Sequence, residues 1–502
     1  MSHCAKEHHR IDVLNWQSGD EVYHSVVVIE GKVDAGCHDG RFQAPENEDN
    51  SIESACDRIS TGIRLVQSLI AEQLNKFGYG RNTFQLQSDL DPGAPDCHVF
   101  YSKIPVEEAH AANGDTLWGW IGRELMTSHL GNENYKFVAF LSSTHYEGKT
   151  FNKFPPTHDE IVECTRGHVA IGGGGLALLH TGCLHTWATS AEEVVARLSS
   201  SSLIDTAFFM DGSNRGTYGG CYSSSLGAVA HELGHTFDLG HTTHGIMGPE
   251  YHDIHYMFLP EECEVVDSPA KSSLSRKSYG AYEDKRICKT KSQSPALKAC
   301  LPPPHAINEE NEISVMMFQE LRVAWKAPEP LSKNITPSDS CTALLSDSPD
   351  PKTDLENHRK TVTAIRNHVH IYKADVKNQD DFHPTLDKHD ISPLFAQSSL
   401  GLLAFNRWIN PNGTKNIDQS ITYDQVRRQV SSLHGLRIID VRDATCKSLL
   451  HWKFLQSHEL QIFVIPEQYI SPDAFSLCVV DSLGNVLKHD LHKQEPEPNI
   501  EV

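Results

Sequence analysis

The segment 231–241 reads HELGHTFDLGH and places three histidines close together in the chain. His231 and His235 are one turn apart if the segment is helical, so both imidazoles leave the same face of the helix. His241 follows six residues later and reaches that face only if the chain turns sharply after the helix. Three imidazoles that converge in this way are typical of a catalytic zinc site, which takes three protein ligands and leaves a fourth position for water.

A carboxylate accompanies these imidazoles. Glu232 follows the first histidine directly, so it can hydrogen-bond a water on the metal without binding the metal itself. Because a purely structural metal site has no need for such a carboxylate, Glu232 is the predicted general base. Cys221 lies nearby in the sequence as a conceivable nucleophile. No base and orienting residue accompany Cys221, so we interpret it as a buried thiol.

The residues before and within the motif predict a buried helix. Apolar side chains recur there at helical spacing, at Leu226, Val229, Ala230, Leu233 and Phe237. The serines at 223–225 are the expected N-caps of this helix. Small residues at 227, 228 and 230 would allow the helix to lie close against a sheet. Such a helix is a rigid mount for two metal ligands.

The run HELGHTFDLGH, followed by GIMG, resembles the signature of the metzincin metallopeptidases, which is His-Glu-x-x-His-x-x-Gly-x-x-His and then a turn with a methionine. The matching positions are His231, Glu232, His235, His241 and Met247. The resemblance implies a peptidase with one Zn²⁺ per chain, in which Met247 forms an apolar floor beneath the ligands. The string is most similar to zinc metalloproteinases of fungi and animals that are described as cytoplasmic, so we expect a cytoplasmic protein.

One position departs from the signature, because Asp238 replaces its glycine. That glycine lets the chain leave the helix in a left-handed conformation, which aspartate adopts more readily than most other residues. We therefore expect the turn to survive and to bring His241 to the metal. Other third ligands stay open: Asp238 itself, which lies nearly on the helical face of His231, and His244 or His252.

Charge and composition exclude several classes of partner. The formal net charge of −22 argues against nucleic acids and against anionic membrane surfaces, which bind clustered lysine and arginine. The first ten residues contain no apolar signal segment, and no run of eighteen apolar residues occurs. Thirteen cysteines without paired spacing are typical of reduced thiols in the cytosol. We expect a peptide or protein substrate, and neither a nucleic acid nor a membrane as partner.

The sequence predicts three parts. Residues 1–50 are expected to contain an N-terminal β segment, residues 55–411 the metzincin-like zinc peptidase domain, and residues 415–495 a small antiparallel β-sandwich. An insertion rich in Ser, Pro, Lys and Glu, at about 263–357, is expected inside the peptidase domain and to be sensitive to proteases. The predicted fold class is α+β or α/β, with a mixed sheet, crossover helices and small all-β terminal domains.

The first third of the chain alternates between strand and helix patterns. The expected elements are a strand at 22–33, a linker at 45–57, a helix with Ile63, Val66, Ile70 and Leu74 on one face, strands at 83–87 and 98–101, a helix at 116–130 and a strand at 137–141. Thr61 is the predicted cap of the first helix and Gly78 its end. This alternation predicts a mixed sheet with crossover helices.

A glycine-rich run, IGGGGLALL at 171–179, precedes the motif helix. In metzincins, an edge strand ahead of the active-site helix holds extended substrate by strand addition, and glycines there would let a peptide backbone approach closely. The other interpretation is a flexible loop before a core strand. The sequence does not decide between these two.

Three functions remain open on the sequence. The first is a zinc metalloendopeptidase in which Glu232 is the general base and Tyr251 a candidate for stabilising the oxyanion, as a tyrosine near the methionine turn does in some metzincins. The second is a binding or scaffold protein with a non-catalytic zinc ion. The third is a zinc amidase acting on a substrate other than a peptide. The presence of Glu232 favours a catalytic site.

Overall fold

A computed structural model of the chain describes residues 22–29, 40–259, 394–410, 420–454 and 460–492, apart from positions 92, 133, 150, 152 and 213–215. The proposed insertion at 263–357, and the protease sensitivity expected of it, lie outside the described residues. Within the described residues, no helix is both long and apolar enough to cross a membrane.

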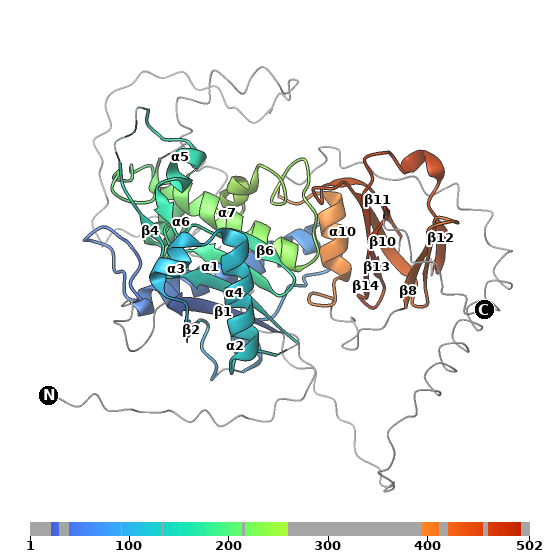
Figure 1. Ribbon diagram of the computed structural model, residues 1–502, viewed down its shortest axis with the longest axis horizontal. Helices are drawn as coiled ribbons and strands as arrows, with labels where there is room; N and C mark the ends of the chain where they lie inside the picture. The colour runs from blue at the N-terminus through green and yellow to red at the C-terminus, as the bar shows by residue number, and fades with distance from the viewer. Residues whose placement is uncertain are drawn as a thin grey trace, which may run out of the picture.

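The centre of the larger part is a five-stranded mixed sheet (Figure 1). Its strand order is β2 (His98–Tyr101), β1 (Val22–Ile29), β3 (Tyr135–Leu141), β7 (Leu176–His180) and β6 (Ala170–Gly173). The first four strands are parallel, and β6 runs antiparallel to β7 at the edge. The expected mixed sheet is therefore confirmed. The glycine-rich run at 171–179 spans the edge strand β6, a turn at 174–175 and most of the buried strand β7.

The N-terminal strand belongs to this sheet. We expected residues 1–50 to form a segment of their own, but β1 lies between β2 and β3 and pairs with both. Val26 is in register with His98 on one side and Ala139 on the other. The sheet of the predicted peptidase domain therefore includes a strand from outside the predicted boundary of 55–411.

Alternation along β3 divides the core into two layers. Phe137, Ala139 and Leu141 face one side, where they pack with helix α4 (Gly114–Thr127). Val138 and Phe140 face the other side and pack with two long helices. These helices are α1 (Ile52–Lys76) and α7 (Tyr218–Thr236), so the sheet lies between two helical layers (Figure 1).

The start of α1 differs from the expectation. The helix begins inside the predicted linker, because the hydroxyl of Ser51 caps it by accepting a hydrogen bond from the Ser54 N–H (3.1 Å). Thr61, the predicted cap, lies inside the helix and donates to the Thr189 carbonyl (3.1 Å). The helix ends at Lys76, and Gly78 follows it with a φ of +82°, as expected of a helix stop.

The predicted strand at 83–87 is wrong. Only a short helix, α2 (Gln87–Leu90), forms at its end. The Gln67 side chain of α1 donates to the Phe84 carbonyl (2.8 Å), and the Thr83 hydroxyl donates to the Gln67 carbonyl (2.9 Å). Hydrogen bonds to α1 therefore hold this segment, in place of pairing with a neighbouring strand.

Shorter elements connect these parts. They are α3 (Val106–Ala111), β4 (His145–Tyr146), α5 (His158–Val162), β5 (Thr165–Arg166), η1 (Leu184–Thr186), η2 (Ala191–Glu193), α6 (Val194–Leu198) and η3 (Tyr251–Met257). Helix η3 packs closely along α7. The lack of a side chain at Gly227 allows this, since a Cβ there would overlap the carbonyl of Tyr251.

The C-terminal part consists of helix α10 (Gln397–Phe405) and two antiparallel sheets, which confirms the expected all-β character of the region after this helix. The strands are β8 (Ile421–Asp424), β9 (Gln429–Ser432), β10 (Leu436–Arg442), β11 (Ser448–Lys453), β12 (Ile462–Val464), β13 (Ser476–Asp481) and β14 (Val486–Asp490). A short 3-10 helix, η8 (Glu467–Tyr469), lies between β12 and β13. The sheet orders are β11-β10-β13-β14 and β12-β9-β8, and side chains such as Val430, Ile439 and Phe463 form a separate apolar cluster.

Candidate metal centre

Helix α7 carries the first two histidines and ends just after them. Thr217 caps its start by accepting a hydrogen bond from the Gly220 N–H (3.1 Å), so the serines at 223–225 are not the caps. At the other end, Asp238 adopts a φ of +67° and the Leu239 N–H donates back to the Gly234 carbonyl (3.1 Å). The aspartate therefore takes the left-handed conformation expected at the glycine position, and the chain turns back along the helix.

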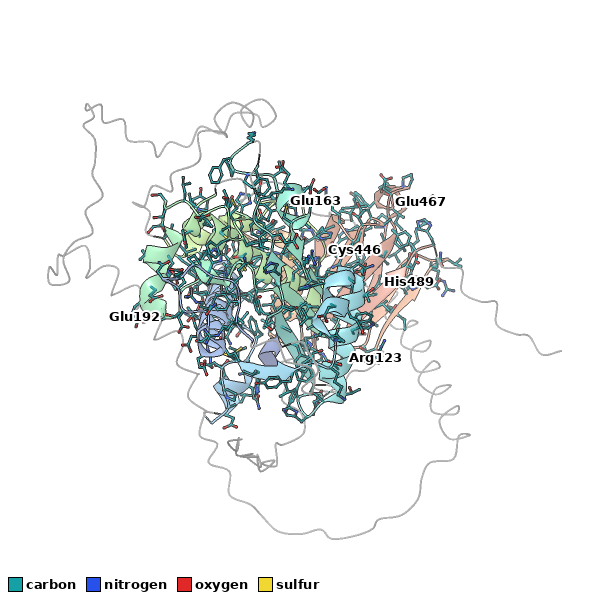
Figure 2. The ribbon with its side chains drawn as sticks, turned by 60° about the vertical axis from the view of Figure 1, so that its left-hand side comes forward. Arg123, Glu163, Glu192, Cys446, Glu467 and His489 are labelled. Carbon is teal, nitrogen blue, oxygen red and sulfur yellow. The ribbon has the colours of Figure 1, made fainter. Side chains whose placement is uncertain are left out.

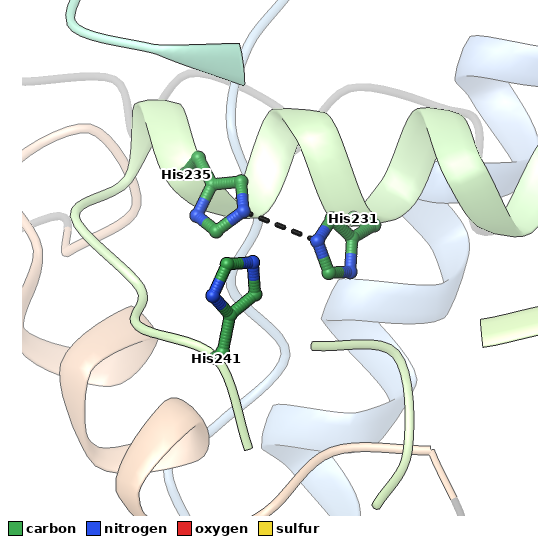
Figure 3. A group of neighbouring side chains, drawn as sticks. All are labelled: His231, His235 and His241. Carbon is green, nitrogen blue, oxygen red and sulfur yellow. Dashed lines mark hydrogen bonds between the residues drawn. The ribbon is translucent and has the colours of Figure 1, made fainter. Parts of the chain in front are cut away.

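This turn brings the three histidines together (Figure 3). One ring nitrogen from each of His231, His235 and His241 lies within 4.8 Å of the other two. The Nε2 atoms of His231 and His235 are 3.1 Å apart. Spacings of this size match imidazoles arranged around one metal ion at ordinary zinc–nitrogen distances.

Backbone carbonyls fix the orientation of all three rings. The Nδ1 of His231 bonds the Ile246 carbonyl (2.7 Å), that of His235 the Leu239 carbonyl (3.0 Å), and that of His241 the Thr445 carbonyl (3.1 Å). Because a carbonyl only accepts, each Nδ1 must carry the proton and donate. Each Nε2 then presents a lone pair to the common centre, which is the form in which imidazole binds a metal.

The surroundings of His231 and His235 favour neutral rings. Burial lowers the pKa of His231, and burial together with His231 lowers the pKa of His235 to about 4. Two lone pairs that face each other at 3.1 Å repel unless a cation lies between them. The donor set therefore fits a zinc ion, which prefers neutral imidazole nitrogen.

Glu232 lies beside this group without belonging to it. Burial raises the pKa of its carboxyl group to about 7, although a hydrogen bond from the backbone N–H of Gly172 acts in the opposite direction. Gly172 lies on the edge strand β6, and a Cβ there would overlap the carbonyl of Glu232. The carboxyl group is therefore held between helix α7 and the edge of the sheet.

Two further predicted residues lie at the site. Met247 is buried against α7, where a Cβ at Gly234 would overlap its sulfur. The Tyr251 ring lies 6.1 Å from that of His231 between centroids. Burial, followed by the charges of Asp211 and Glu232, raises the pKa of Tyr251, which therefore keeps its phenolic proton.

The alternative ligands face elsewhere. Asp238 forms an ion pair with Lys488 of β14. His244 Nδ1 lies 3.1 Å from the Thr243 hydroxyl, and His252 Nε2 lies 3.4 Å from an Asp253 carboxylate oxygen. Among the described residues, these alternatives are not part of the group formed by the three motif histidines.

Sequence reasoning missed two contributors to the site. One is Gly172, whose N–H bonds the Glu232 carboxyl group. The other is Thr445, whose carbonyl bonds His241 across a separation of 204 residues. Neither role has a local signal, because each depends on how distant segments pack. The glycine run was the nearest hint, since it pointed to a close backbone approach.

Two curated relatives resemble part of the chain. A putative zinc metalloproteinase of Schizosaccharomyces pombe is 26% identical over 269 residues, which are 50% of this chain and 41% of the relative. A putative zinc metalloproteinase of Saccharomyces cerevisiae is 27% identical over 256 residues, which are 45% of this chain and 35% of the relative. The chain therefore matches only about two fifths of the length of these proteins.

Solved structures with some likeness include OgpA from Akkermansia muciniphila. The catalytically inactive protein in complex with an O-glycopeptide substrate, glycodrosocin, is 15% identical with a TM-score of 0.27, over 48% of this chain and 58% of OgpA. The wild-type protein is 12% identical with a TM-score of 0.35, over 94% of this chain and 93% of OgpA. Scores this low establish neither fold nor function.

The family comparison is more extensive. A family model described as "Putative peptidase family" (Metallopep) matches residues 37–298, just over half of the 502 residues. The match includes helix α7, the three histidines and the turn with Met247, and it ends before the C-terminal sheets. With its histidine group in the matched region, the chain belongs to this family of metallopeptidases.

Proposed function

We propose that the protein is a zinc metalloendopeptidase of the metzincin type, with one Zn²⁺ per chain held by His231, His235 and His241. The observation that carries this proposal is the set of three Nδ1–H groups bonded to carbonyls, which leaves three Nε2 lone pairs for one cation. The names of the two yeast relatives support zinc as that cation.

The residues around the metal have separate tasks in this proposal. A zinc ion bound there would polarise the scissile carbonyl and lower the pKa of water in the fourth position. Glu232 takes a proton from the attacking water and delivers it to the leaving amine. The phenolic O–H of Tyr251 is proposed to donate a hydrogen bond to the developing oxyanion. Met247 provides the apolar floor that keeps the rings in place.

We further propose that β6 holds the substrate as an added strand. Within the described part of the chain it is the edge of the sheet, and no strand pairs with its outer side, where an extended peptide could be added. A Cβ at Gly173 or Gly175 would meet no atom within 4 Å, which leaves room for a peptide backbone. Because Gly172 contacts Glu232, a peptide on this edge would pass the general base.

A cytoplasmic location forms part of the same proposal. The described cysteines, at 56, 97, 164, 183, 221, 446 and 478, are all free thiols, and all but Cys56 and Cys446 are buried. Buried thiols without disulfides are typical of proteins from reducing compartments.

Metal analysis and peptide digestion test the function together. We expect close to one zinc per purified chain, cleavage inside members of a peptide library, and loss of cleavage after treatment with a chelator. Glu232→Gln should keep zinc and fold but lose at least ~10²-fold in turnover, because the general base is removed. His241→Ala should lose zinc as well.

The outcomes separate the alternatives. A Glu232→Gln variant as active as the wild type would rule out the proposed mechanism. A zinc-loaded wild type that cleaves no peptide in the library would favour the scaffold protein. Cleavage of amide substrates without cleavage of peptides would favour the zinc amidase.

A further inference from the structure

The third histidine is embedded in the C-terminal part of the molecule. The His241 N–H donates to the Cys446 carbonyl (3.0 Å), and the Ser448 N–H donates to the His241 carbonyl (2.8 Å). These two bonds form a parallel bridge between His241 and Lys447. Together with the ring bond to Thr445, they attach both the backbone and the imidazole of this residue to the loop between β10 and β11 (Cys446 is labelled in Figure 2).

A buried ion pair packs against the segment 238–241, which leads to the third histidine. Arg442 on β10 donates to Asp440 (Nε to Oδ2, 2.6 Å) and to the carbonyl of Asp238 (Nη2, 2.7 Å). The two charged side chains are 7% and 1% exposed, so both are removed from water. A Cβ at Gly240 would lie 2.5 Å from the Cys446 carbonyl oxygen and 2.8 Å from Arg442 Nε. The turn between helix α7 and His241 therefore packs tightly against Arg442.

The loop 443–447, which supplies the Thr445 carbonyl, is stabilised by hydrogen bonds to Asp443. One carboxylate oxygen of Asp443 accepts from the Thr445 N–H (2.8 Å), the Thr445 hydroxyl (2.7 Å) and the Lys447 N–H (3.0 Å). Cys446 follows with a φ of +61°, which completes a tight turn. The Thr445 carbonyl is thereby presented to His241 in a fixed position.

The three ligands thus differ in what holds them. His231 and His235 lie on one helix and bond carbonyls at most fifteen residues away, at Ile246 and Leu239. His241 bonds a carbonyl 204 residues away, in a region outside the family match. Its geometry depends on the C-terminal sheets.

We propose that Arg442 and the loop 443–447 are positioning elements for the third metal ligand, so that zinc affinity depends on the C-terminal β domain. This inference rests on the proposed zinc site. Partners that hold a ligand histidine in its tautomer and orientation affect metal affinity by about 10- to 100-fold when they are lost. The effect is expected here because, without Arg442, the Asp238 carbonyl loses its hydrogen bond and Gly240 loses a close packing contact.

The test compares two arginines on one strand. Arg442→Met removes the contact to the Asp238 carbonyl. Arg437→Met removes an equally buried arginine of β10 that lies over the Phe405 ring (5.9 Å) instead of the metal segment. Zinc affinity is measured by competition with a chromophoric chelator, and Co²⁺ absorption reports the number of ligands. We expect a 10- to 100-fold loss of affinity and an altered Co²⁺ spectrum for Arg442→Met, and wild-type values for Arg437→Met.

Milder variants cover the case in which Arg442→Met does not fold, since it leaves the buried Asp440 without this partner. Arg442→Lys keeps the charge but cannot reach both oxygens as a guanidinium does. Asp443→Ala removes the brace of a loop at the surface. Both should weaken zinc binding in a folded protein. Wild-type affinity in both would overturn the inference while leaving the proposed function intact. A wild-type protein that binds no zinc would overturn the proposed function itself.

Discussion

Asp238 illustrates how a single backbone conformation decides the geometry of the site. With a φ of +67°, it reverses the chain between His235 and His241. A side chain with a Cβ costs free energy in this conformation, although aspartate pays less than most residues. Its carbonyl also accepts a hydrogen bond from Arg442 (2.7 Å), which stabilises this conformation.

We expect Asp238→Gly and Asp238→Ala to differ in stability. Both remove the ion pair with Lys488. The Lys488 side chain is 58% exposed, so this ion pair contributes little to the free energy of unfolding. The difference between them combines the cost of a Cβ in the left-handed conformation, about 1–2 kcal/mol, with the larger entropy that glycine loses on folding, which offsets part of that cost. Urea denaturation of the two variants should show that difference in the free energy of unfolding, with glycine the more stable. Equal values would mean that the turn relaxes to another conformation.

Residues of the site were predictable where the signal is local. The spacing of His231 and His235, the adjacent Glu232 and the tolerance of aspartate for the turn all follow from a short stretch of chain. The partners of these residues were not predictable, because Thr445 and Gly172 contribute backbone groups whose positions depend on sheet register and domain packing. A side chain can carry a sequence signal, whereas a carbonyl or an N–H occurs at nearly every position.

At the scale of elements, the strand β6 connects the central sheet to Glu232, the proposed general base. Among the described residues it pairs only with β7, and its other side is the proposed place for a peptide. Gly172 and Gly173 are neighbours on this strand but differ in their surroundings. A Cβ at Gly172 would overlap the Glu232 carbonyl, whereas one at Gly173 would meet no atom within 4 Å.

Gly172→Ala should therefore impair the enzyme more than Gly173→Ala does. The added methyl group must push β6 away from α7, which displaces the N–H that bonds the Glu232 carboxyl group. We expect at least a tenfold loss of kcat/KM and a loss of stability of about 1–3 kcal/mol for Gly172→Ala, as for other overpacked sites. Peptide cleavage and thermal unfolding of both variants provide the comparison. A similar loss of stability at the two positions would contradict the close packing of β6 on the helix.

The errors at this scale have a common cause. Thr61 and Ser51 are equally plausible caps in the sequence, but Thr61 lies on the buried side of α1 and bonds Thr189 across the core. The segment 83–87 has a strand-like pattern. The Gln67 side chain nevertheless donates a hydrogen bond to the Phe84 carbonyl, which a neighbouring strand would otherwise have bonded. In both cases a tertiary hydrogen bond outweighs the local preference.

For the whole molecule, the expected boundary near residue 411 does not separate two cores. Ile438, Cys478 and Val480, on the face of β10 and β13 that turns away from the second sheet, belong to the main core together with α10. All seven residues of β10 are buried, so this strand is covered on both faces. Alternation in the sequence cannot reveal this, because it shows one apolar face per strand and not what covers the other.

We expect zinc to protect two distant segments of the chain from hydrogen exchange together. A bound metal fixes the His241 ring, whose Nδ1 bonds Thr445, and the backbone of the same residue is bonded to Cys446 and Ser448. Chelation should therefore raise the rate of local opening in both segments, 238–248 and 443–448, because they share these hydrogen bonds.

Hydrogen exchange followed by mass spectrometry checks this with matched samples of zinc-loaded and chelator-treated protein. The amides of His241 and Ser448 should lose protection to a similar extent, since each donates one bond of the same bridge. Peptides from the centre of β13, whose strand pairs with β10 and β14 away from the metal, are the internal control and should not change. Faster exchange confined to 238–248 would show that the loop 443–447 keeps its structure without the metal, and would contradict the coupling between this loop and the third ligand, because such coupling acts equally in both directions.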